Sequence, residues 1–158
     1  EIEEMEEEEE EEQKQERASA CRDCLGKGEP VSGAALCTAS RSGHVQCVRA
    51  LVQGAASPSS GAVGAVRAVE YLDQEGMGPL MHAAMKGHVE CVRVLLAEGG
   101  ADVNAKNQEG LTAVMLASLA GHLASLSLLL QLGADVNAAD ECGAVALMAA
   151  AEAGHVAG

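Results

Sequence analysis

The sequence predicts an all-α solenoid of helix–loop–helix units with short hairpin-like finger loops, about 3.5 repeats long. The dipeptide Gly-His occurs four times, beginning at Gly43, Gly87, Gly121 and Gly154, and the last three copies are 34 and 33 residues apart. A period of about 33 residues is the length of one unit of a stacked helical repeat. The chain has no Trp or Phe, so small aliphatic side chains must fill the space between closely packed helices. Solenoids mainly present extended binding surfaces, which argues against an enzyme.

The charge of the chain is unevenly distributed. The net charge is -14, and residues 1–17 contain eleven Glu against Lys14 and Arg17. Such a run cannot bury enough apolar surface to become ordered, so we predict an acidic disordered tail. The negative charge disfavours a phosphate-backbone partner, and with Tyr71 as the only aromatic residue no platform of stacked aromatics can form. The composition therefore argues against nucleic-acid binding.

The repeat landmarks divide the rest of the chain. The step from Gly43 to Gly87 is 44 residues, about eleven more than the period, which indicates an insertion between the first two repeats. We expect a linker at 18–33 and a repeat domain at 34–158, with repeats at about 34–56, 73–105, 107–138 and 140–158 and the insertion at 57–72. The fourth repeat stops before its second helix, which should cover Val145, Leu147 and Met148. We therefore expect further repeats, further domains or a partner beyond the C-terminus.

Two repeats carry the same landmarks at the same offsets. The second runs from Asp73 to Gly87-His88 and continues to Gly-Ala-Asp-Val-Asn-Ala at 100–105, and the third repeats this pattern from Gly110 to 138. This arrangement resembles the ankyrin repeat over about residues 34–156. Thr112 suits a helix N-cap and Pro79 a first helical turn, whereas Gly78 and Val145 replace the capping threonine and weaken those caps.

Other repeat positions also have a structural interpretation. Gly87, Gly121 and Gly154 are expected to end the first helices in the left-handed conformation, and the histidine that follows each is expected to bond loop backbone. The second helices show apolar residues at helical spacing. His82 falls at a variable position of a first helix and has no evident Glu or Cys partner. The predicted core positions of the second helices are Val92, Leu95, Leu96, Leu126, Leu129 and Leu130.

The resemblance implies a binding surface as well as a fold. Members of the ankyrin family usually bind protein partners with their finger tips and with exposed positions of the first helices, which line the concave face. The mix of Met, Leu and Glu at these positions implies a partly apolar partner with some basic groups. The matching positions are Gln74, Glu75, Met77, Met85, Lys86, Lys106, Gln108, Glu109, Leu111, Leu119, Glu141, Cys142, Ala144 and Glu152.

The resemblance also suggests a modification. Asn104 and Asn137 each follow Asp-Val and have a leucine eight residues upstream, which is similar to the context in which ankyrin-repeat asparagines are hydroxylated by an oxygenase. The structural alternative is that each asparagine bonds the backbone of its turn.

The cysteines leave one alternative open. Cys21 and Cys24 form a C-x-x-C-x-G-x-G motif that looks like one zinc half-site of the DnaJ-type cysteine-rich domain. Tetrahedral zinc needs two such pairs, and only Cys37 and His44 could complete a set, inside the first repeat. We interpret the motif as part of the linker and predict no cofactor. Cys47 and Cys91 occupy equivalent apolar positions and are expected to be small, reduced, buried residues.

The leading hypothesis is a non-catalytic scaffold or adaptor, cytoplasmic or nuclear, that binds a protein through its concave surface. No stretch of about 18 apolar residues exists, so we expect no membrane insertion. One alternative is a regulatory or targeting segment of a larger enzyme or membrane protein. The other is a zinc- or redox-responsive module that uses Cys21 and Cys24.

Overall fold

The computed structural model describes the chain over residues 33–55, 68–152 and 154. The predicted acidic tail, nearly all of the linker with Cys21 and Cys24, and most of the predicted insertion lie outside these ranges. The described part is all-α, as predicted, and its one β-type pairing is an isolated bridge between Ala139 and Val145. Its helices are α2 (Gly33–Ser42), α3 (Val45–Ala55), α5 (Pro79–Lys86), α6 (Val89–Ala97), α7 (Ala113–Ala120), α8 (Leu123–Gln131) and α9 (Ala146–Glu152).

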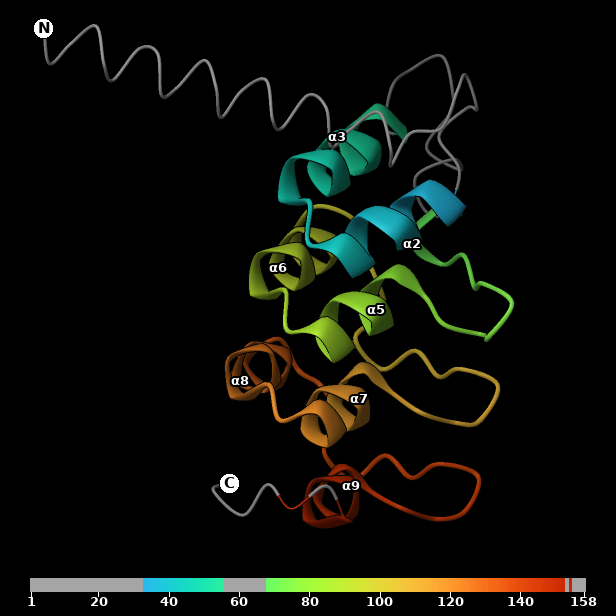
Figure 1. The fold of residues 1–158 in the computed structure, drawn as a ribbon, viewed down its shortest axis with the longest axis vertical. Coiled ribbons are helices and arrows are strands. Elements are labelled where there is room, and N and C mark those ends of the chain that lie inside the picture. Colours follow the sequence, from blue (N-terminus) through green and yellow to red (C-terminus); the bar gives the residue numbers. More distant parts are fainter. Residues whose placement is uncertain (1–32, 56–67, 153, 155–158) are drawn as a thin grey trace, which may run out of the picture.

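The helices form two parallel columns (Figure 1). The inner column contains α2, α5, α7 and α9, each packed on the next, and the outer column contains α3, α6 and α8. The segments that lead into α5, α7 and α9 project to the same side of the stack. We call them finger 1 (71–78), finger 2 (98–112) and finger 3 (132–145). The columns and the fingers together make the extended surface of a solenoid.

The ends of the first helices follow from single residues. Thr112 precedes α7, and its hydroxyl accepts a hydrogen bond from the Met115 N–H at 3.4 Å. Gly78 at the same place before α5 supplies no such bond, as its lack of a side chain predicts. At the other end, Gly87 and Gly121 adopt φ of 77° and 76°, and their N–H groups cap the last turn. The sequence predicted each of these features.

The Gly-His pairs also hold neighbouring repeats together. A β-carbon on Gly43 would lie 2.6 Å from the ring of His88, so the glycine is required by this contact as well as by its φ of +76°. Gly87 and His122 repeat the same contact one unit further on. The Nε2 atom of His88 lies 3.2 Å from the carbonyl oxygen of Arg41. The histidine therefore bonds backbone, but at His88 this backbone is the last turn of α2 in the preceding repeat and not the loop that the sequence predicted.

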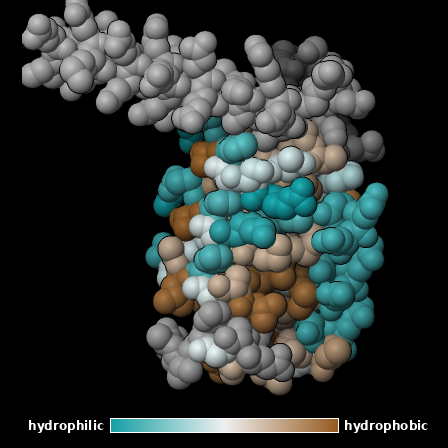
Figure 2. Space-filling view, viewed as in Figure 1, coloured by the Kyte–Doolittle hydropathy of each residue, from teal (hydrophilic) through white to brown (hydrophobic). Residues whose placement is uncertain are grey.

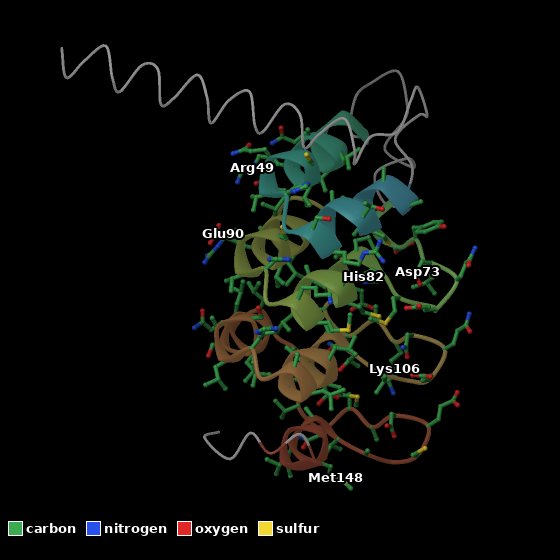
Figure 3. The ribbon with its side chains drawn as sticks, viewed as in Figure 1. Arg49, Asp73, His82, Glu90, Lys106 and Met148 are labelled. Carbon is green, nitrogen blue, oxygen red and sulfur yellow. The ribbon has the colours of Figure 1, made fainter. Side chains whose placement is uncertain are left out.

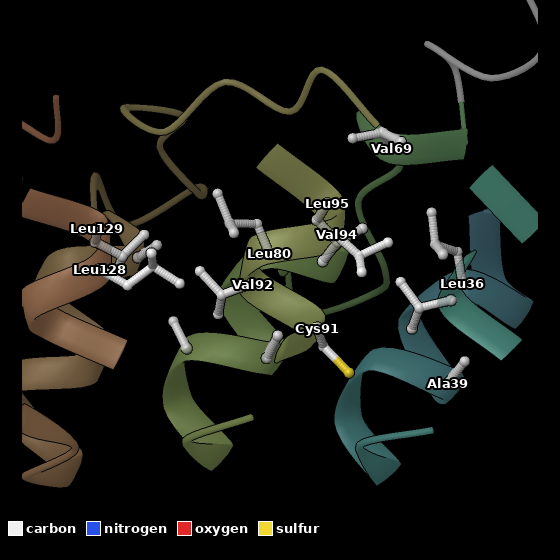
Figure 4. Close-up of a cluster of buried hydrophobic side chains, with 14 of the residues drawn as sticks. Leu36, Ala39, Val69, Leu80, Cys91, Val92, Val94, Leu95, Leu128 and Leu129 are labelled. Atoms are coloured by element: carbon white, nitrogen blue, oxygen red, sulfur yellow. The ribbon is translucent and has the colours of Figure 1, made fainter. Parts of the chain in front are cut away.

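A continuous aliphatic core runs between the two columns (Figure 4). Val92, Leu95 and Leu129 are fully buried, as predicted. Leu96 and Leu126 pack against the core but are only partly buried. Leu130 is 40% exposed, so the prediction of a core position there is wrong. Among the described helices α8 packs mainly on α6 and α7, and no further outer helix is described beyond α8.

The buried cysteines differ from one another. Cys91 is a free thiol with no exposed surface, and burial raises its pKa to about 11. This is the small, reduced core residue that the sequence predicted. Cys47 is equally buried, but it is disulfide-bonded, so the expectation of a reduced thiol is wrong there. Both side chains belong to the same buried hydrophobic core.

Candidate protein-binding surface

The three fingers share one turn at their tips. In finger 1, the Oδ1 atom of Asp73 accepts hydrogen bonds from the N–H groups of Glu75 and Met77, both at 2.9 Å. Asn107 makes the same pair of bonds in finger 2 and Asp140 in finger 3. A side chain that bonds backbone two and four residues ahead fixes a tight turn. The turn therefore fixes the backbone of the two residues that follow Asp73, Asn107 or Asp140, and with it the direction of their side chains.

Hydrogen bonds also join finger 2 to finger 3. Asn104 Oδ1 accepts the Asp135 N–H at 2.7 Å, and the Glu141 N–H donates to the carbonyl of Glu109 at 3.2 Å. Lys106 Nζ donates to the carbonyl of Ala139 at 2.9 Å. Fingers 2 and 3 therefore form a connected edge rather than separate loops. The bond made by Asn104 agrees with the structural interpretation of that residue, and hydroxylation of Asn104 or Asn137 stays a prediction.

Most of the residues that the sequence assigned to the binding surface are accessible. Met85, Leu111 and Ala144 are half-buried, and the side chain of Glu152 lies outside the described set. Met77 differs, because it is only 6% exposed and packs against Met81 and Leu116 beneath the surface. The exposed positions are Gln74, Glu75, Lys86, Lys106, Gln108, Glu109, Leu119, Glu141 and Cys142.

These side chains separate into two kinds of surface (Figure 2). The fingers form a hydrophilic edge, and hydrophobic side chains gather beside it over the lower part of the inner column. The finger tips carry Glu75, Glu109 and Glu141, one exposed carboxylate each. On the inner helices, Leu119 is 47% exposed and Met85 is half-buried. We call this combination the concave surface.

A polar groove lies at one end of the concave surface, between α2 and finger 1. Its volume is about 330 Å³. His82 of α5 and Asp73 of finger 1 point toward each other there (Figure 3), and His82 Nε2 lies 2.7 Å from Asp73 Oδ2. The other residues that line the groove are Ala34, Cys37, Thr38, Arg41, Tyr71, Gln74 and Glu75.

Sequence reasoning missed the His82–Asp73 pair. His82 is only 3% exposed, and its partner lies nine residues earlier in the chain on a different element. Burial acts to raise the pKa of Asp73, but hydrogen bonds from Met77, His82 and Glu75 outweigh it and hold this pKa below its usual value of 3.8. The sequence did contain a signal for this pair, because Asp73 begins the repeat whose first helix carries His82.

The groove brings a cysteine near this pair without making it reactive. Burial, together with the negative charge of Asp73, raises the pKa of Cys37 to about 12, against a smaller opposite effect of Arg41. Its Sγ atom donates to the Met77 carbonyl at 3.9 Å. Because the thiolate is the nucleophile and the zinc ligand, this protonated thiol suits neither role. No cluster of three metal-binding side chains occurs within the described residues.

Comparison with known families agrees with the repeat architecture. The family model described as ankyrin repeats (3 copies) matches residues 17–107, 62–140 and 96–157. The chain belongs to the ankyrin-repeat family. Repeats of this family generally mediate protein–protein interactions, and proteins built from them are typically not catalytic. No curated protein matches the chain.

Among the residues that the structure describes, no helix combines the length and the apolar character that crossing a bilayer requires.

Proposed function

We propose that this chain is a non-catalytic scaffold or adaptor that binds a protein partner through its concave surface. The observation that carries the proposal is the exposed apolar side chain of Leu119 on α7, with Met85 half-buried on the neighbouring inner helix α5, on a surface whose three finger tips each carry an exposed carboxylate. Exposed apolar side chains rimmed by polar residues are typical of protein interaction sites. Hydrogen bonds that connect fingers 2 and 3 hold this part of the surface in shape before any partner arrives, which lowers the entropy cost of binding.

The partner is a segment that combines apolar and basic side chains. Apolar groups would pack on Leu119 and Met85, whose unbranched thioether adapts to irregular surfaces. Basic groups would approach Glu75, Glu109 and Glu141, which lie along one edge at successive finger tips. Long-range attraction of this kind accelerates association and weakens as salt is added. The net charge of -14 also favours a partner with basic groups.

Site-specific photo-cross-linking tests which face binds. A photoreactive amino acid replaces either Leu119 of α7 or Leu123 of α8, which are 47% and 52% exposed. The two positions match in residue type and exposure but lie in different columns. In an extract of the source cells we expect a discrete cross-linked partner from position 119 and none from position 123. A partner captured equally from both positions, or only from position 123, contradicts the proposed surface.

A binding measurement with the captured partner then tests its chemistry. Replacing Glu75, Glu109 and Glu141 together with glutamine should reduce the association rate by about tenfold at low salt, because the steering charge is lost. The difference should shrink at 0.5 M salt, where the Debye length is on the order of 4 Å. An association rate that is independent of both salt and the substitutions would show that the acidic edge has no part in binding.

A further inference from the structure

The groove between α2 and finger 1 differs from the matching place one repeat further along the stack. The matching place, between α5 and finger 2, is filled by Met77, Met81 and Leu116, with Met85 and Leu111 packed beside them. Asn107 there accepts the same two backbone N–H groups as Asp73, but its amide donates to the sulfur of Met77 at 3.7 Å. One repeat thus fills this space with apolar side chains, and its neighbour leaves a polar groove of about 330 Å³.

The groove is rich in hydrogen-bond acceptors. The carboxylates of Asp73 and Glu75 line it against a single cation, Arg41, which is exposed. His82 also lines it, is 3% exposed, and has an Nδ1 atom with no hydrogen-bond partner. In the neutral tautomer whose Nε2 donates to Asp73, this Nδ1 atom is a buried acceptor. A buried polar atom without a partner is costly, so the groove favours an occupant that donates hydrogen bonds.

The wall of the groove favours a flat cation. Tyr71, the only aromatic residue of the chain, lines the groove and lies directly against Gly33. A guanidinium group stacks on aromatic rings and donates up to five hydrogen bonds in a planar fork that matches carboxylates. A lysine ammonium is a compact charge. It stacks on an aromatic ring less well, and it cannot donate the parallel pair of hydrogen bonds that matches a carboxylate.

We propose that this groove is a specificity pocket that receives an arginine side chain of the protein partner. The guanidinium lies between Tyr71 and the carboxylates of Asp73 and Glu75, where its N–H groups meet acceptors. The pocket rests on the proposed use of the concave surface, and it adds a single anchoring position to that surface. Asp73 has two roles in this pocket. Its Oδ2 atom binds the guanidinium, and its Oδ1 atom fixes the finger turn by accepting two backbone N–H groups.

Titration of the full ¹⁵N-labelled chain with small probes tests this pocket directly. The probes are N-acetyl-arginine methylamide, the lysine analogue, and the citrulline analogue, which has nearly the shape of arginine but no charge. We expect the arginine probe to shift the amide signals of Glu75 and Met77 with saturation in the millimolar range, on the order expected for one anchoring side chain. The lysine probe should bind several-fold more weakly, and citrulline should not saturate.

Three variants complete the experiment. Asp73→Asn removes the charge while keeping the turn, as Asn107 does in finger 2, and should weaken arginine binding by about tenfold. Tyr71→Leu should weaken it by about threefold. Glu90→Gln removes an exposed charge from α6 in the outer column, away from the groove and the fingers, and should leave binding unchanged.

The outcomes separate this pocket from the wider proposal. Equal binding of arginine and citrulline, equal binding of arginine and lysine, or undiminished binding to Asp73→Asn overturns the pocket. Cross-linking from position 119 does not depend on these probes. A positive cross-link from position 119 with a negative titration therefore retains the concave surface and contradicts the arginine site. A positive titration without a cross-link from position 119 contradicts the concave surface.

Discussion

At the scale of single residues, the three finger tips show how one side chain can serve two purposes. Asp73, Asn107 and Asp140 make the same two hydrogen bonds to backbone, so the turn needs only an oxygen acceptor and accepts either residue type. Only Asp73 also meets a histidine. The turn itself therefore does not need the negative charge of Asp73, since Asn107 makes the same two bonds without one.

This difference predicts a pH-dependent contribution to stability. The pKa of Asp73 is lower in the folded protein than its usual 3.8. Its carboxylate thus stabilises the fold above pH 3.8, and this contribution disappears as the pH falls through the lower, folded-state pKa. Asp73→Asn should reduce the free energy of unfolding by about 1 kcal/mol at pH 7, and urea titrations near pH 3 should show a smaller difference.

Asp140→Asn is the matched control for this prediction. It changes the same residue type in the same turn, but no histidine pairs with Asp140 among its described contacts. Its effect on unfolding should be smaller and less dependent on pH. Equal pH profiles for the two variants would mean that His82 adds nothing to the turn.

At the scale of elements, each first helix depends on the residue before it. Thr112 supplies a side-chain cap to α7, and Gly78 leaves α5 without one. Gly78 has an extended backbone, with φ of -89° and ψ of 167°. A β-carbon added there would lie 3.6 Å or more from its nearest neighbours, which is ordinary contact. Nothing in the backbone or its surroundings requires glycine at this position.

We therefore predict that Gly78→Thr stabilises the protein. The new hydroxyl can cap α5, and the loss of glycine reduces the entropy of the unfolded chain, for a combined gain of about 0.5–1 kcal/mol. Chemical denaturation of the variant and of Thr112→Gly measures the effect in both directions. A destabilised Gly78→Thr variant would show that the helix start cannot accept the cap that α7 uses.

At the scale of the whole molecule, the stack is quasi-one-dimensional, because each repeat touches only its neighbours. Among the described inner helices, α5 and α7 have a neighbour on each side, whereas α9 is the last and packs mainly on α7. Leu147 and Met148 of α9 are 78% and 50% exposed, in accord with the expectation that they lack a covering helix. Val145 is partly buried.

Local stability should follow this gradient. Hydrogen exchange measured by mass spectrometry should show the greatest protection in α5 and α7, and faster exchange in α9, because its opening exposes the least buried surface. Peptides from α5 are the internal reference in the same sample. Equal protection of α5, α7 and α9 would indicate that the described stack opens as one cooperative unit.

Much of this organisation could be predicted because it is local. The Gly-His period, the cap at Thr112 and the left-handed glycines each depend on a few neighbouring residues, whose types determine the conformation. Most core positions of the outer helices could also be predicted from their spacing. Leu130 could not, because its exposure depends on whether another helix lies beyond α8.

By itself the sequence determined the repeat family and the all-α repeat fold, and the binding surface that it predicted stays a proposal. The tertiary structure alone decided that Met77 is buried, that His82 pairs with Asp73, and that one inter-repeat space is a polar groove while the next is filled. The physical reason is that these features join side chains from a finger and from two successive inner helices. Spacing along one helix carries no information about which side chains from the next repeat will occupy the space above it.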